Sequence, residues 1–145
     1  MSGERSKSDK QKCLTSGAVA VYATGPVPID VTVDGCDMLP CRFTRGSNIS
    51  SSVTFKTPGP VTQMNPFLNV QVGGVWMNFD AGQKDGCDSL VEKECPLKEG
   101  EISTYVFQIP IQNGYPKIRI KVEHLMLDAL RRPVFCYGIT GKVIG

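Results

Sequence analysis

The feature that most constrains this chain is an alternation of apolar and polar residues with a period of two, which recurs in one segment after another. Successive side chains of a β-strand point to opposite faces, so this period predicts strands with one buried face each. The alternation is clear in residues 27–33, 52–56, 68–72, 104–111 and 117–126. The segments 14–22 and 134–142 are β-prone but less regular. The pattern predicts seven or eight strands.

Turn-forming residues separate these runs, and they do so at short intervals. The turn signals are Asp34-Gly35, Pro58-Gly59-Pro60, Gly73-Gly74, Asp85-Gly86, Glu99-Gly100 and Asn113-Gly114. Helix signals are nearly absent, since 15 glycines and 10 prolines are spread along the chain. Trp76 is expected in a loop-like stretch. Strands with one apolar face must bury those faces against each other, which predicts an all-β, immunoglobulin-like sandwich of two sheets.

The length of 145 residues predicts a single domain. Residues 1–11 are polar and are expected to form a flexible N-terminal extension, whereas residues 12–145 would form the domain. That extension does not resemble a signal peptide. This polar start and the six cysteines of the chain fit together if this is a mature chain from which a signal peptide has been removed.

Six cysteines indicate an oxidising compartment and therefore a secreted protein. They are Cys13, Cys36, Cys41, Cys87, Cys95 and Cys136. Six cysteines allow fifteen pairings, and their spacing does not select one. The simplest set has two local pairs and one long closure from Cys13 to Cys136.

Several functional classes are disfavoured by what the chain lacks. The cysteine spacings miss the zinc templates and His124 is the single histidine, so no metal site is expected. No nucleophile elbow, zinc-protease or phosphate-loop motif is present, which argues against an enzyme. A net charge of +2 does not favour nucleic acid. No apolar run approaches the ~20 residues that span a bilayer.

Several short motifs occur in an order that resembles a known family. Residues 36–46 read C-D-M-L-P-C-R-F-T-R-G, residues 95–100 read C-P-L-K-E-G, and residues 109–116 read I-P-I-Q-N-G-Y-P. Val122-Glu123, Asp128 and Phe135-Cys136 follow. Together they resemble the MD-related lipid-recognition (ML) family, and within it the Niemann-Pick type C secreted sterol carriers and their arthropod relatives. The likeness extends from about Cys13 to Ile144.

The resemblance implies a sandwich with an apolar cavity between its sheets and no cofactor. It implies the disulfides Cys13–Cys136, Cys36–Cys41 and Cys87–Cys95. Family members bind sterols, fatty acids or other lipids. The aromatic and apolar residues that form the family's cavity portal correspond here to Phe79, Ile111 and Tyr115.

Two positions depart from the sterol carriers, which have tryptophan where this chain has His124 and Tyr137. By alternation, His124 shares an inward face with Val122 and Met126. It is interpreted either as a core histidine that bonds a carbonyl, or as a polar anchor or pH-sensitive gate for a lipid head group. The loss of both indoles favours a flexible ligand over a rigid sterol. Met64, Leu68, Phe107 and Met126 are expected to line such an adaptable cavity, although Met126 is equally interpretable as core.

The predicted function is an extracellular or lysosomal carrier of a small hydrophobic molecule, such as a fatty acid, a sterol or a semiochemical, acting as a monomer. The alternative is an innate-immune protein that presents lipid to a receptor. Asn48-Ile49-Ser50 is an N-glycosylation sequon. Lys117, Arg119 and Lys121 form a basic stripe on one strand, interpreted as a solvated face or as a transient contact with an anionic membrane.

Overall fold

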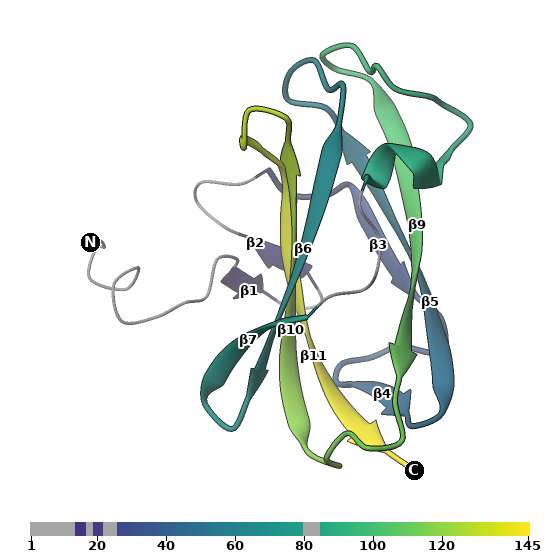
Figure 1. Ribbon diagram of the computed structural model, residues 1–145, viewed down its shortest axis with the longest axis vertical. Coiled ribbons are helices and arrows are strands. Elements are labelled where there is room, and N and C mark those ends of the chain that lie inside the picture. The colour runs from purple at the N-terminus through teal and green to yellow at the C-terminus, as the bar shows by residue number, and fades with distance from the viewer. Residues whose placement is uncertain (1–13, 17–18, 22–25, 80–84) are drawn as a thin grey trace.

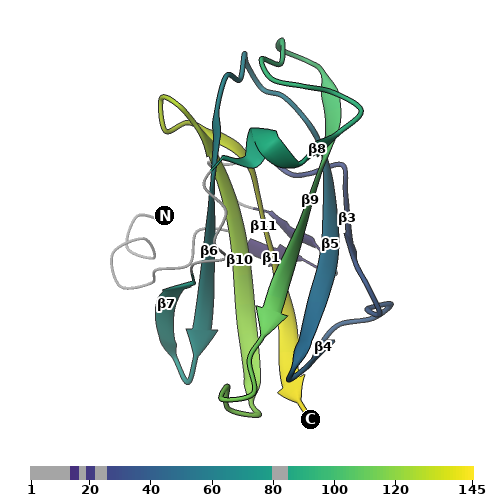
Figure 2. The same cartoon turned by 45° about the vertical axis from the view of Figure 1, so that its right-hand side comes forward.

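The computed structural model describes residues 14–16, 19–21, 26–79 and 85–145. Within them, two β-sheets face each other as the layers of a sandwich (Figure 1). One sheet has five strands in the order β4-β11-β10-β6-β7, and the other has four in the order β3-β5-β9-β8. The same two layers are seen after a turn of 45° (Figure 2). The predicted all-β sandwich is confirmed.

The strands of the five-stranded sheet are β4 (Cys41–Thr44), β6 (Met64–Val72), β7 (Val75–Phe79), β10 (Arg119–Asp128) and β11 (Pro133–Ile144). The four-stranded sheet contains β3 (Asp30–Val33), β5 (Ser47–Lys56), β8 (Leu90–Val91) and β9 (Ile102–Ile111). Two short strands, β1 (Leu14–Ser16) and β2 (Val19–Val21), pair with each other near β11. A 3-10 helix, η1 (Gly86–Ser89), precedes β8.

The predicted periodicity identifies the inward faces correctly, and some strand limits differ. The expected strand at 27–33 begins only at Asp30, because Pro28 has no N–H to donate to a neighbouring strand. The Asp85-Gly86 signal starts η1 instead of a turn: the Asp85 carboxylate accepts a hydrogen bond from the backbone N–H of Cys87 over 2.9 Å and caps the helix.

Trp76 was expected in a loop-like stretch, but it lies in a β-strand. Gly73 and Gly74 have φ values of 58° and 85° and form a two-residue turn, which is the geometry that matches the twist of antiparallel strands. The chain therefore folds back along β6, and Trp76 lies within β7 opposite Gln71.

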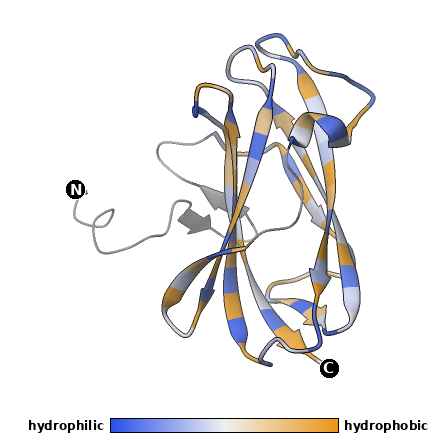
Figure 3. Ribbon diagram, in the orientation of Figure 1, coloured by the Kyte–Doolittle hydropathy of each residue, from blue (hydrophilic) through white to orange (hydrophobic). Residues whose placement is uncertain are grey.

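The core fills the space between the sheets, where apolar and polar bands alternate along each strand (Figure 3). Two of the implied disulfides are confirmed, Cys36–Cys41 and Cys87–Cys95, with Sγ–Sγ distances of 2.03 and 2.01 Å. The third involves Cys13, which lies outside the described residues, as does the predicted extension 1–11.

Candidate functional site

Two adjoining cavities lie along the inner faces of the sheets. They share Leu68, Asn78 and Phe79 as lining residues, so one continues into the other at this point. The smaller has a volume of ≈240 Å³ and the larger ≈820 Å³. Ligand sites usually measure about 300–1,000 Å³. The smaller cavity is therefore too small by itself for most ligands, and a ligand there would extend toward the larger one.

The smaller cavity is almost entirely apolar. Both sheets contribute to it, because β6, β7, β10, β11 and β4 form one wall while β9 and the β9–β10 connection form the other. The residues that line it are Phe43, Leu68, Val70, Val72, Met77, Asn78, Phe79, Ile109, Ile111, Tyr115, Pro116, Ile120, Val122 and Val143. Such a surface favours hydrocarbon, since removing apolar area from water yields roughly 25 cal/mol per Å².

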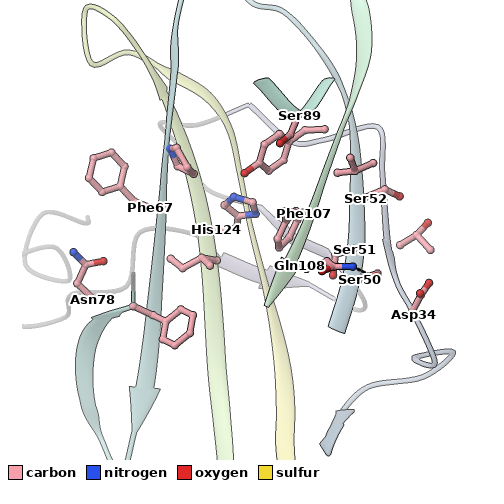
Figure 4. A pocket seen from close by; sticks show the side chains of 16 residues that line it. Asp34, Ser50, Ser51, Ser52, Phe67, Asn78, Ser89, Phe107, Gln108 and His124 are labelled. Atoms are coloured by element: carbon pink, nitrogen blue, oxygen red, sulfur yellow. Dashed lines mark hydrogen bonds between the residues drawn. The ribbon is translucent and has the colours of Figure 1, made fainter. Parts of the chain in front are cut away.

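The larger cavity is more polar. Its inner wall carries Leu68, Tyr105, Phe107 and His124, with His124 placed between the sheets beside Phe107 (Figure 4). Asp34, Ser50 and Ser52 also line it, but from the outer side of β3 and β5, so not all of its volume lies between the sheets. Ser51 faces inward between Ile49 and Val53, where its small side chain leaves room next to Phe107.

A row of residues across four strands marks the boundary between the two cavities. The β-sheet register places Tyr137 opposite His124, His124 opposite Leu68, and Leu68 opposite Phe79. Two residues from His124 on β10, Val122 lies opposite Val70 in a neighbouring row, and both line the apolar cavity. His124, the candidate polar anchor, and Val122, which lines the apolar cavity, are thus consecutive inward-facing residues of β10.

Phe79 and Tyr115 meet edge to face at the apolar cavity, with ring centroids 6.3 Å apart and planes at 77°. Phe79 belongs to the edge strand β7, and Tyr115 follows β9 in the other sheet. Both rings are partly exposed, which places them where the cavity approaches solvent. Partial burial raises the pKa of the Tyr115 hydroxyl, so the group stays neutral.

His124 is buried among aromatic rings. Its imidazole lies 4.7 Å from the Phe107 ring, centroid to centroid, and 5.3 Å from those of Phe135 and Tyr137. Its Nδ1 atom lies 2.9 Å from the hydroxyl oxygen of Tyr137. Burial lowers the pKa of His124 to about 3 and raises that of Tyr137. His124 is therefore neutral near pH 7 and near pH 5, which argues against a gate that responds to mild acidification.

Most of the residues predicted to contact ligand lie on these cavities. Ile111, Tyr115 and Val122 line the apolar cavity, Phe107 and His124 line the larger one, and Leu68 and Phe79 line both.

Met64, Met126 and Tyr137 line neither cavity. The two methionines are fully buried and pack around Gly86, where an added Cβ would lie 3.0 Å from Met126 Cε. Tyr137 contacts His124 instead. The sequon residue Asn48 is exposed on β5.

Sequence reasoning missed several lining residues that carried a usable signal. Val70 and Val72 continue the inward alternation of Leu68, Ile109 lies between Phe107 and Ile111, and Ile120 shares the face of Val122. Phe43 sits in a short strand with little periodicity. Ser51 breaks the apolar inward set of β5, and that polar exception was the available sign of a cavity.

Metal-binding clusters and membrane-spanning helices are both absent from residues 14–16, 19–21, 26–79 and 85–145. In these ranges no group of three or more His, Cys, Asp or Glu side chains is arranged to hold a metal ion. No helix in the same ranges is long and apolar enough to cross a membrane.

Solved structures share this architecture. A Niemann-Pick type C2 protein from Japanese carpenter ant superposes with a TM-score of 0.75 at 17% identity, covering 92% of this chain and 98% of the ant protein. Chicken MD-1, crystallised with lipid IVa, gives a TM-score of 0.51 at 14% identity, covering 77% of this chain and 78% of the chicken protein. At these identities the likeness shows the fold.

The sequence comparisons agree. NPC intracellular cholesterol transporter 2 from Bos taurus is 30% identical over 114 residues, or 79% of this chain and 75% of the bovine protein. The Canis lupus familiaris protein of the same name is 28% identical over 116 residues, or 80% and 76%. The family model of the ML domain matches residues 8–143. With its two-sheet sandwich and nearly the whole sequence matched, this chain belongs to the ML domain family.

Proposed function

We propose that this protein is a secreted, non-enzymatic carrier of a small hydrophobic molecule. The observation that carries the proposal is the apolar cavity of ≈240 Å³ between the sheets, which opens into a larger and more polar one at Leu68 and Phe79. A carrier needs a concave, largely preformed apolar site, and it needs no reactive group. The names of the relatives, cholesterol transporters among them, support this assignment.

The size of the apolar cavity favours a narrow, flexible ligand over a fused ring system. Leu68 and Phe79 line both cavities, so an acyl or alkyl chain can follow the inner face of β10 past Val122. Fatty acids, esters and related semiochemicals belong to this class, and a sterol would require the cavity to widen. Secretion is supported by the two confirmed disulfides and by the exposed sequon at Asn48.

The test combines identification of co-purified lipid with binding of the fluorescent probe N-phenyl-1-naphthylamine. Val122→Phe adds a ring to the floor of the apolar cavity and is expected to weaken probe binding at least tenfold. Ile102→Phe is the matched control, because Ile102 is 50% exposed on β9 and lines neither cavity. Absence of any bound lipid and of probe binding would refute the carrier function, as would equal binding by both variants.

Delivery of ligand to an anionic membrane is supported by one feature of the outer face. Arg42, Lys142 and Arg119 lie directly opposite one another on β4, β11 and β10, and all three are exposed. Like charges in register are destabilising, so this row favours an anionic surface as partner. Transfer of probe to vesicles of phosphatidylcholine with phosphatidylglycerol should exceed transfer to phosphatidylcholine alone. Arg119→Gln should reduce that difference, whereas Lys93→Gln should not.

A second candidate function is presentation of a bound lipid to an immune receptor. Trp76 is partly exposed on β7, the edge strand whose Met77 and Phe79 line the cavities, and aromatic residues of this kind are frequent at protein interfaces. Co-precipitation with receptor ectodomains tests this function. Binding that is lost in Trp76→Ala, with lipid binding retained, would favour presentation over simple carriage.

A further inference from the structure

His124 lines the larger cavity, and the Nε2 atom of its imidazole is a buried polar atom. His124 is 1% exposed, and Nε2 has no hydrogen-bond partner among the described residues. Two other buried side-chain atoms share that condition, Arg45 Nε and Ser103 Oγ, but their residues line neither cavity. Leaving a buried polar group without a partner is costly, so its presence beside a cavity indicates a ligand group that satisfies it.

Tyr137 determines whether that atom donates or accepts. If the Tyr137 O–H donates to Nδ1, the imidazole proton resides on Nε2, and Nε2–H is the single unpartnered group of the pair. In the opposite arrangement Nδ1–H donates to the tyrosine oxygen, and both the hydroxyl hydrogen and the Nε2 lone pair lack partners. The first arrangement leaves fewer buried groups unsatisfied. His124 therefore carries an unpartnered hydrogen-bond donor on a side chain that lines the cavity.

The surroundings select an uncharged acceptor. The rings in contact with His124 belong to Tyr105, Phe107, Phe135 and Tyr137, and burial keeps both tyrosines neutral by raising their pKa values. Among the described residues, no cationic side chain lines this cavity, and its one charged side chain, Asp34, lies on the outer side of the sheet. A carboxylate placed here would lose its hydration without gaining a counter-ion, which is costly.

The inward face of β10 gives the direction in which the hydrocarbon tail of a ligand would extend from His124. From His124, the inward positions of β10 continue to Val122 and Ile120, which line the apolar cavity. The four residue steps from His124 to Ile120 span about 13 Å. A medium-length hydrocarbon chain with its oxygen at His124 thus fits the apolar cavity.

We propose that His124 Nε2–H, oriented by Tyr137, is the head-group site for a medium-chain aliphatic ester, aldehyde or ketone, whose tail occupies the apolar cavity. The assignment rests on the carrier function proposed above. It narrows the ligand from hydrophobic molecules in general to those with a neutral carbonyl at one end, in preference to the free fatty acid.

The binding test compares methyl decanoate, decanoic acid and undecane as competitors of N-phenyl-1-naphthylamine at pH 7.5. We expect methyl decanoate to bind about tenfold more tightly than undecane, the worth of one buried hydrogen bond, and more tightly than decanoate. His124→Phe should remove this advantage and leave the affinity for undecane unchanged. Equal binding of ester and undecane, tightest binding of decanoate, or an advantage that persists in His124→Phe would each overturn the assignment while the carrier function stands. Failure of all three competitors to displace a bound probe would overturn the assignment alone, whereas absence of probe binding and of any bound lipid would overturn both.

A second measurement requires no variant. The chain contains one histidine, so the imidazole ¹⁵N signals of a labelled sample are assigned without ambiguity. We expect the tautomer with hydrogen on Nε2, and a shift of the Nε2–H signal with methyl decanoate that undecane does not produce. Hydrogen on Nδ1 would leave no Nε2–H to donate and would overturn the proposal. The same shift with both ligands would mean that Nε2–H merely rests against the Phe107 ring, and would overturn it as well.

Discussion

The ring of Phe79 meets the ring of Tyr115 edge to face, with 6.3 Å between their centroids, where the two sheets approach each other over the apolar cavity. Phe79 ends β7 in the five-stranded sheet and Tyr115 lies in the connection from β9 to β10, so their contact joins two separate parts of the cavity lining without a covalent link. An edge-to-face pair contributes about 0.5–1.5 kcal/mol beyond its buried area. That small energy suits a contact that opens and closes.

Removing one of these rings should speed ligand release. Tyr115→Ala deletes the partner of Phe79 and is expected to raise the dissociation rate of bound N-phenyl-1-naphthylamine by about 2- to 10-fold, the kinetic equivalent of the lost contact. Stopped-flow dilution measures the rate. Ile102→Ala is the control, since Ile102 lies on β9 outside both cavities. An unchanged rate in Tyr115→Ala would show that ligand leaves by another path.

Gly141 has no room for a side chain. It faces inward on β11, and a Cβ built there would overlap the ring of Phe43, a residue that lines the apolar cavity. Gly141→Ala is therefore expected to lower the free energy of unfolding by about 1–3 kcal/mol and to displace the Phe43 ring. Denaturant unfolding and probe binding are the measurements. Gly59→Ala should be neutral or slightly stabilising, because a Cβ at Gly59 meets nothing within 4 Å.

The sequence allowed the fold and much of the cavity lining to be predicted, because both follow from the same period of two. Inward positions such as Leu68, Phe107 and Val122 were identified by alternation, and Phe79, Ile111 and Tyr115 by the family motifs that surround them. These residues do line the cavities.

Alternation identifies which side chains face inward, but it does not show where facing side chains leave space. Met126 and Met64 face inward like Val122, yet they are packed solid around Gly86, a residue that the sequence indicated only as part of a turn. The reverse holds at Ser51, where a small polar side chain leaves a cavity beside Phe107. Such differences depend on pairs of residues brought together by the fold, which no single strand pattern contains.

His124 should make the fold sensitive to acid. Its pKa is lowered by burial from 6.5 to about 3, and the rings in contact with it carry no group that titrates in this interval. Between these two values the unfolded chain binds a proton that the folded chain excludes, so stability falls as the pH falls below about 6.5. The loss is about 1.4 kcal/mol per pH unit, or roughly 2–3 kcal/mol by pH 4.5.

The variant His124→Phe isolates this effect, because Phe fills the same aromatic environment and has no proton to bind. We expect its free energy of unfolding to vary less between pH 7 and pH 4.5 than that of the parent chain, by roughly 2–3 kcal/mol. Urea unfolding at several pH values provides the comparison. Parallel curves would mean that His124 becomes protonated in the folded protein.

The carboxylate of Asp128 should be the most important surface-proximal charge for stability. Asp128 is 6% exposed and accepts hydrogen bonds from the backbone N–H groups of Leu130 and Arg132 over 2.9 and 2.8 Å, and from Arg132 Nε over 2.9 Å. These bonds shape the turn between β10 and β11, where Arg131 has a φ of 64°. Although burial raises the pKa of Asp128, the hydrogen bonds from Arg132 and Leu130 outweigh it and lower the pKa below its usual value.

Asp128→Ala is therefore expected to cost about 2–3 kcal/mol in the free energy of unfolding, the worth of hydrogen bonds to a charged group. Lys93→Ala breaks an exposed ion pair with Glu101, whose Nζ and Oε2 atoms are 3.3 Å apart, and should cost less than about 1 kcal/mol. Because the pKa of Asp128 is lowered, its contribution is complete above the unfolded value of 3.8 and disappears as the pH falls through the folded value. The gap between parent and Asp128→Ala should thus be constant from pH 7 to pH 5 and should narrow below pH 3.8. A gap that stays the same at lower pH would assign the loss to the turn geometry rather than to the charge.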